Sequence, residues 1–172
     1  LSRQFREGEV EKRYIAVVRG HLDEDIEIKR PVRRSKNGPR VDAHSRVRSL
    51  ALSVIPEPLG PFDEIWYSLV EVELFTGRYH QARSHLRSVD HPVLGDTTHG
   101  DGTQNAYLRD NFGIDNLLLR AYRIGLDHPQ TGERIDCISG LPEWWLEALT
   151  ATRLSGCDEL VVEPSVRTIS NA

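Results

Sequence analysis

The densest group of residues able to do chemistry lies between Leu74 and Asp101. Its first part, L-F-T-G-R-Y-H-Q-A-R-S-H-L from Leu74 to Leu86, joins a glycine turn to guanidinium and imidazole side chains. Its second part, which begins at Asp90, contains D-H-P-V-L-G-D followed by H-G-D. Arginine, histidine and backbone N–H donors at this density suit an anionic, planar ligand. The segment therefore indicates a binding site for such a ligand.

Arg83 is the residue in this segment that local preference explains least. The spacing predicts a helix that begins near Tyr79, and a guanidinium near the start of a helix opposes the helix dipole. Such a residue commonly forms an ion pair with a carboxylate from elsewhere. For its neighbours Arg78, His80 and Gln81 the plainer alternative is a charged helix face in contact with solvent.

A metal site is a competing interpretation of the same segment. His80, His85 and Asp96 could serve a metal-dependent hydrolase, but their spacing matches neither H-E-x-x-H nor a Cys/His zinc pattern. Asp96 and Asp101 fit better as residues that stabilise turns or helix starts through Asx hydrogen bonds. We therefore expect that no metal is bound.

Length and composition indicate one soluble domain. A chain of 172 residues fits a single domain with a proper core, and its two cysteines are too few for a disulfide framework. No apolar run approaches the roughly 20 residues of a membrane span. A cytoplasmic protein is the plain expectation. The chain contains no Met and begins at Leu1, which indicates a fragment or a processed piece.

The formal charge of −4 argues weakly against a nucleic-acid partner, but the charge is unevenly distributed. Between residues 29 and 48 the only acid is Asp42, whereas the bases are Lys29, Arg30, Arg33, Arg34, Lys36, Arg40, Arg46 and Arg48. Because salt limits the reach of each charge to about 10 Å, such a basic stripe can bind phosphates even though the net charge of the whole chain is negative. A solvated charged loop is the alternative.

Hydrophobic periodicity predicts the elements that must position these residues. Alternation on both faces of 13–22 indicates a buried strand. Two long strands joined by a proline-rich turn indicate an antiparallel meander. The expected fold is α+β, with a mixed, largely antiparallel sheet and flanking helices, and with a loosely ordered tail over 155–172. The expected strands are 13–22, 44–55, 66–74, 117–126 and 134–138; the expected helices end near Phe5, begin near Tyr79, span 105–112 and follow Pro142; 28–42 is an extended basic loop.

The segment resembles the L-x-T-G-R-x-H-Q-[IL]-R-x-H-L…H-P-[IL]-x-G-D-x-x-[YH]-G signature of the RluA-type pseudouridine synthases. The resemblance runs from Leu1 to about Leu149, and features such as G-D-T-T-H-G-D from Gly95 are similar to a subgroup that acts on tRNA. It implies isomerisation of uridine to pseudouridine in RNA, with tRNA as partner and with no cofactor, metal or membrane. Residues 1–154 would then be the C-terminal part of a catalytic domain.

The same resemblance implies roles for individual residues. Tyr14 corresponds to the active-site tyrosine that packs against the target base and serves in proton transfer; a core aromatic is its plain alternative. Arg83 corresponds to the arginine that pairs with the catalytic aspartate, and Leu118 or Leu119 would supply an apolar wall beside the base. The residues expected to contact RNA are Arg33, Arg34, Lys36, Arg40, Arg78, His80 and Gln81.

One element of the family pattern does not occur in the 172 residues. The H-R-L-D segment, which carries the attacking aspartate, is absent from the sequence and is expected upstream of Leu1. Without that aspartate Arg83 is expected to have no carboxylate partner, and the 172 residues alone are expected to be inactive. A noncatalytic RNA-binding remnant of the same fold is the alternative function.

Overall fold

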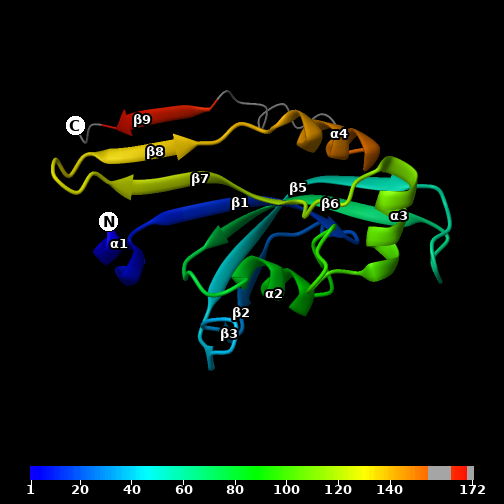
Figure 1. Ribbon diagram of the computed structural model, residues 1–172, viewed down its shortest axis with the longest axis horizontal. Coiled ribbons are helices and arrows are strands. Elements are labelled where there is room, and N and C mark those ends of the chain that lie inside the picture. Colours follow the sequence, from blue (N-terminus) through cyan, green and yellow to red (C-terminus); the bar gives the residue numbers. More distant parts are fainter. Residues whose placement is uncertain (155–163, 170–172) are drawn as a thin grey trace.

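The computed structural model describes residues 1–154 and 164–169. Seven strands form one sheet in the order β2-β5-β6-β1-β7-β8-β9, and β3 and β4 form a separate hairpin (Figure 1). The strands are β1 (Glu11–Arg19), β2 (Ile26–Lys29), β3 (Val32–Arg33), β4 (Arg40–Val41), β5 (His44–Ile55), β6 (Ile65–Leu74), β7 (Leu119–Asp127), β8 (Arg134–Ile138) and β9 (Ser165–Ile169). The helices are α1 (Ser2–Glu7), α2 (Gln81–Ser88), α3 (Gly102–Phe112) and α4 (Glu143–Ala151).

The sheet confirms the expected α+β class, since each of its strand pairs is antiparallel. The predicted meander is β5 and β6, in which Ser45 faces Leu74 and Ile55 faces Ile65. The segment 28–42, predicted as an extended basic loop, instead contains the end of β2 and the hairpin β3–β4. Its apolar residues Ile28 and Val32 are buried, which ties these short strands to the rest of the molecule.

The central strand β1 separates two hydrophobic clusters. Ile15 and Val17 face one cluster, which includes Leu108 of α3 and the buried Trp145 of α4. Ala16 and Val18 face the other cluster, which is covered by α2. Figure 1 shows α2 on one side of the sheet and α4 on the other. Because both faces are covered, β1 is apolar at successive positions, as its sequence predicts.

Two β-bulges interrupt the regular pairing of the sheet. On β7, Ala121 faces Tyr14 and Arg123 faces Arg13, so Tyr122 is the extra residue. On β5, Ser49 faces Val70 and Ala51 faces Leu69, so Leu50 is the extra residue. A bulge adds one residue to one strand and re-aims the side chains beside it. The first of these bulges lies directly opposite Tyr14.

The tail differs from the expectation of loose order. Ser165–Ile169 forms β9, an edge strand that pairs with β8 from Ser165 opposite Ile138 to Ile169 opposite Arg134. Five residues are enough to extend an existing sheet edge, although they are too few to show a clear period in the sequence. The rest of the expected tail, 155–163 and 170–172, lies outside the described residues.

Across the described ranges, no helix combines the length and the apolar character needed to cross a membrane.

Candidate active site

The site begins where β6 ends and the chain turns into α2. The amide of Gln81 fixes this turn: its oxygen accepts hydrogen bonds from Thr76 Oγ1 and the Arg78 backbone N, and its nitrogen donates to the His44 carbonyl and Ser45 Oγ. All four hydrogen-bonding positions of the amide are therefore used. Only 2% of Gln81 is exposed. The expectation that Gln81 contacts RNA is corrected accordingly, because its side chain is committed to holding the turn.

A second tight turn, from Gly95 to Gly100, faces α2. Gly95 has φ 74°, and a Cβ on it would lie 1.9 Å from the Asn116 carbonyl oxygen, so only glycine fits without a backbone shift. The amide of Asn105 holds the start of the turn: its oxygen accepts from Gly95 N at 2.8 Å, and its nitrogen donates to the Asp96 carbonyl at 3.0 Å. This packing places the Asp96 carboxylate toward α2.

Arg83 grips Asp96 with two hydrogen bonds. Its Nε donates to Oδ2 at 2.7 Å and its Nη2 donates to Oδ1 at 2.6 Å. The Asp96 carboxylate also accepts from the backbone N of Thr98 and of His99, both at 2.8 Å. Burial alone would raise the pKa of Asp96, but the hydrogen bonds from Arg83 and the two amides outweigh it and lower the pKa to about 2. The pair is therefore fully charged at neutral pH.

This ion pair corrects one expectation and confirms another. Arg83 has a carboxylate partner within the chain, contrary to the expectation that it would lack one. The predicted Asx role of Asp96 is confirmed by its bonds to Thr98 and His99, and that of Asp101 by its bonds to the Thr103 and Gln104 amides at the start of α3. The sequence contains a clue to this pair: Asp96 follows Gly95 in the same motif as Arg83 and is therefore a nearby carboxylate for an arginine that is unfavourable at a helix start.

Two histidines extend the polar network from Arg83. Arg83 Nη1 lies 3.1 Å from His80 Nε2, and His80 Nδ1 lies 3.2 Å from His99 Nε2. Since a guanidinium can only donate, His80 Nε2 accepts, and its Nδ1–H donates to His99. Burial and the nearby guanidinium lower the pKa of His80 and of His99, which favours these neutral forms. Each hydrogen bond in this network is therefore donated away from Arg83: Arg83 donates to His80, and His80 donates to His99.

His85, the other histidine of the metal interpretation, does not join this network. His85 is buried, with Nδ1 2.9 Å from Ser45 Oγ and Nε2 2.9 Å from the Arg30 carbonyl oxygen. In the parts of the chain that the structure describes, no group of three or more His, Cys, Asp or Glu side chains is arranged to hold a metal ion.

Tyr14 lies on the α2 side of the sheet. It packs against the cluster that contains Ala82 and Leu86, and Leu119 borders the same cluster. Leu118 is fully buried in the cluster on the opposite face. Of the two leucines expected beside the base, the structure therefore leaves Leu119 as the candidate and assigns Leu118 to the core.

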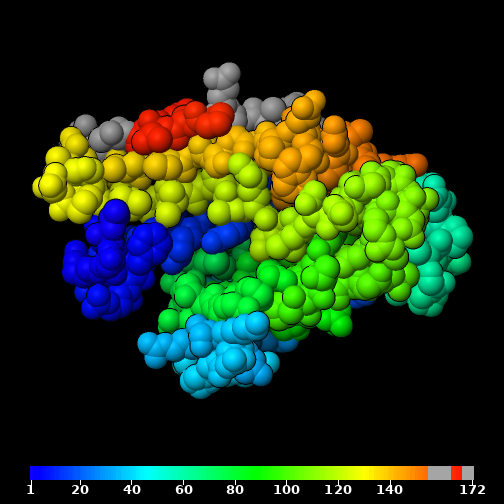
Figure 2. Space-filling model, in the orientation of Figure 1, coloured from blue at the N-terminus to red at the C-terminus, as the bar shows by residue number. Residues whose placement is uncertain are grey.

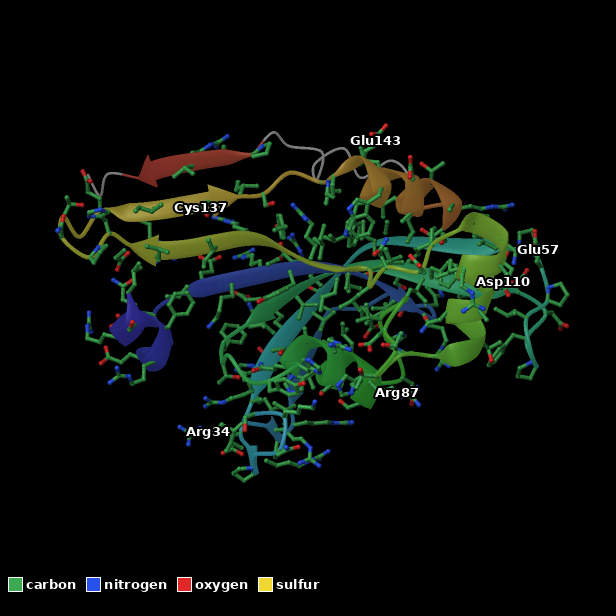
Figure 3. The ribbon with its side chains drawn as sticks, in the orientation of Figure 1. Arg34, Glu57, Arg87, Asp110, Cys137 and Glu143 are labelled. Carbon is green, nitrogen blue, oxygen red and sulfur yellow. The ribbon has the colours of Figure 1, made fainter. Side chains whose placement is uncertain are left out.

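The basic stripe divides into an ion-paired part and a free part. On β2 and β5, Lys29 pairs with Glu27, Arg46 with Glu27 and Glu73, and Arg48 with Glu71. On the hairpin, the side chains of Arg33, Arg34, Lys36 and Arg40 are exposed, and none forms an ion pair with a described residue. Arg78 is also exposed and donates to the Asp42 carbonyl at 3.4 Å. Figure 2 shows the hairpin, in light blue, projecting from the body of the molecule, and Figure 3 places Arg34 on it.

Comparison with known proteins identifies the family. The family described as RNA pseudouridylate synthase matches residues 1–88, which include β1, the basic hairpin and α2. The chain belongs to this family. It is 37% identical over 161 residues to tRNA pseudouridine synthase C of Salmonella typhimurium, covering 87% of this chain and 62% of the relative. The corresponding protein of Yersinia pestis is 34% identical over 167 residues, covering 91% of this chain and 65% of the relative.

Two solved structures share the fold of this chain. Human RNA Pseudouridylate Synthase Domain Containing 1 superposes with a TM-score of 0.64 at 24% identity, over 99% of this chain and 65% of that one. Human RNA Pseudouridylate Synthase Domain Containing 4 gives a TM-score of 0.57 at 21% identity, over 88% and 66%. The chain thus spans less than two thirds of the length of the first relatives that it matches.

Proposed function

We propose that this protein takes part in the isomerisation of uridine to pseudouridine in tRNA. The observation that carries the proposal is the placement of Arg83 at the start of α2, charged and rigidly held, in a helix that packs against the same face of the sheet as Tyr14. These are the two positions that match the family's arginine and tyrosine. The names of the relatives support tRNA as the substrate.

In the proposed reaction the glycosidic bond between nitrogen and ribose breaks, and the base rejoins the ribose through carbon. The base loses the hydrogen from that carbon and gains one on the released nitrogen, so the product is an isomer. Tyr14 would pack against the base and move a proton, and Leu119 would border it. The target uridine must unstack from its neighbouring bases, which costs a few kcal/mol, and contacts between the hairpin and the RNA phosphates would help to offset this cost.

We propose that the attacking aspartate comes from an H-R-L-D segment outside these 172 residues. Arg83 retains the capacity to hold it. A guanidinium has five N–H groups; Asp96 takes two and His80 takes one. One N–H on each terminal nitrogen has no partner among the described residues. Arg83 could therefore orient a second carboxylate while Asp96 keeps the guanidinium in place.

The test is tritium release from bulk tRNA that carries 5-tritiated uridine. We expect no release by the 172-residue chain and release by a chain with an H-R-L-D segment ahead of Leu1. Changing the aspartate of that segment to Asn should abolish the release. Release by the 172-residue chain would place the nucleophile within it and contradict the proposal. Binding of tRNA without release by the extended chain would instead support the noncatalytic alternative.

A further inference from the structure

A cationic cleft lies between the hairpin β3–β4 and α2. It has a volume of about 380 Å³, and four arginines line it: Arg30, Arg33, Arg40 and Arg87. None of its described lining residues is an aspartate or a glutamate. Figure 3 shows Arg87 on α2 and Arg34 on the hairpin along the same edge of the molecule. The cleft therefore has a strongly positive potential that nothing in its lining offsets.

The walls of the cleft are fixed before any ligand arrives. The buried His85 of α2 donates from Nε2 to the Arg30 carbonyl at 2.9 Å, and the Arg30 guanidinium donates back to the Ser88 carbonyl at the end of α2. Val32 of the hairpin is buried. These contacts hold the hairpin against α2, so little conformational entropy is lost when the cleft binds a ligand.

Tyr79 adds a flat apolar surface to this cationic cleft. Its ring stacks on His80, with centroids 3.8 Å apart and planes 17° apart, and 36% of the residue is exposed. His80 is itself held by Arg83 and His99 and adopts the left-handed conformation, with φ 50°. A non-glycine residue in that conformation persists only where its surroundings require it. The ring of Tyr79 therefore stacks on a histidine whose position is fixed by Arg83, which is itself held by the buried Asp96.

We propose that this cleft binds a nucleotide of the RNA outside the target position, with its base stacked on Tyr79 and its phosphates on Arg33, Arg40 and Arg87. The inference rests on the proposed function, because it takes RNA to be the ligand. An exposed aromatic ring beside several cations is the arrangement that binds single-stranded nucleotides without base-specific hydrogen bonds. Tyr79 then supplies affinity through stacking, and the arginines supply the part that depends on salt.

The test compares tRNA binding by variants of the 172-residue chain in filter assays over a range of salt concentrations. Tyr79→Leu should weaken binding roughly 5- to 150-fold without changing the salt dependence, whereas Tyr79→Phe should bind like the wild type. Arg87→Gln should reduce the slope of log K against log salt by about 0.7 to 0.9. Phe112→Leu and Arg109→Gln are the matched controls, since both residues are exposed and neither lines the cleft.

The outcomes separate this inference from the proposed function. Wild-type affinity for Tyr79→Leu, or equal losses for Tyr79→Leu and Tyr79→Phe, would overturn the stacking role. A variant with Gln at Arg33, Arg34, Lys36 and Arg40 tests the hairpin as a whole. If this variant loses affinity for tRNA while Tyr79→Leu and Arg87→Gln do not, the nucleotide-binding role of the cleft is wrong, and the proposal that the protein binds RNA stands. If polyglutamate binds with the same dependence on Tyr79, the cleft recognises an acidic polypeptide instead. If the wild type does not bind tRNA, the proposed function itself fails.

Discussion

The carboxylate of Asp96, none of whose side-chain surface is exposed, is held by the Nε and Nη2 atoms of Arg83, whose own side chain is only 15% exposed. It is the most enclosed ion pair among the described residues. The pair joins α2 to the turn that begins at Gly95. Since Arg83 also bonds to His80, which in turn bonds to His99, the pair connects the Gly95 turn and α2 to the two histidines of the site.

Removing Arg83 should leave a buried charge without its counter-charge. We expect Arg83→Ala to lower the free energy of unfolding by about 3–5 kcal/mol. Asp96→Asn should destabilise the wild type but partly restore Arg83→Ala, because the amide oxygen can still accept from the backbone and no charge is left buried. Urea unfolding of the two single variants and the double variant shows whether Asp96→Asn lowers the free energy of unfolding in the wild type and raises it in Arg83→Ala.

The control for that experiment is Arg109→Ala, which removes an exposed ion pair with Asp110. Such a pair contributes about 0–1 kcal/mol. Equal losses for Arg83→Ala and Arg109→Ala would show that the enclosed pair is not important for stability.

The division of the basic stripe predicts where salt-dependent RNA binding originates. Replacing Arg33, Arg34, Lys36 and Arg40 by Gln should weaken tRNA binding and flatten the slope of log K against log salt by up to about 3.6, at about 0.7 to 0.9 per phosphate contact. Arg46→Gln with Arg48→Gln, which removes cations already paired with Glu27, Glu73 and Glu71, should change the slope little. The reverse ranking would place the RNA on the sheet face and not on the hairpin.

Stability should decline in mild acid because of His85. Burial lowers the pKa of this imidazole, and its neutral form is needed to accept from Ser45. A histidine with a lowered folded-state pKa contributes its full stability above its unfolded pKa of about 6.5, and loses it as the pH falls from there toward the folded value. We expect the Tm to fall as the pH drops below about 6.5.

His85→Gln should have a lower Tm at pH 7.5 and a flatter pH profile than the wild type. His21→Gln, at an exposed position, controls for the loss of a histidine. Asp96 does not contribute in this range, because its pKa of about 2 keeps it ionised in the folded state. An unchanged profile in His85→Gln would assign the acid sensitivity to His80 and His99, whose pKa values are also lowered.

The turn at Gly95 should not accept a side chain. Gly95→Ala places a methyl group 1.9 Å from the Asn116 carbonyl oxygen at φ 74°, so the backbone must shift and the Arg83–Asp96 pair with it. We expect a loss of more than about 1 kcal/mol. Gly102→Ala, in the first turn of α3 with no atom within 4 Å of its added Cβ, should be neutral or stabilising. Thermal unfolding of the two variants gives the comparison.

The helices and most strands could be predicted from sequence, whereas the shortest strands could not. β5 and β8 match their predicted bounds because each strand is delimited by a clear change in residue type; β5, for example, ends at Ile55, immediately before Pro56. The hairpin β3–β4 has strands of two residues, which are too short to show a period. The partner of Arg83 is set by how Gly95 and Asn105 fold the turn in three dimensions.

The two bulges determine where this sheet can change length. Removing Tyr122 would bring Ala121 and Arg123 into consecutive register with Tyr14 and Arg13, so the flanking pairs would stay on their present faces. Removing a neighbour such as Ile124 would instead send every later side chain of β7 to the opposite face. Leu50 has the same property on β5. One-residue insertions and deletions in related chains should therefore concentrate at these two positions, one of them opposite Tyr14.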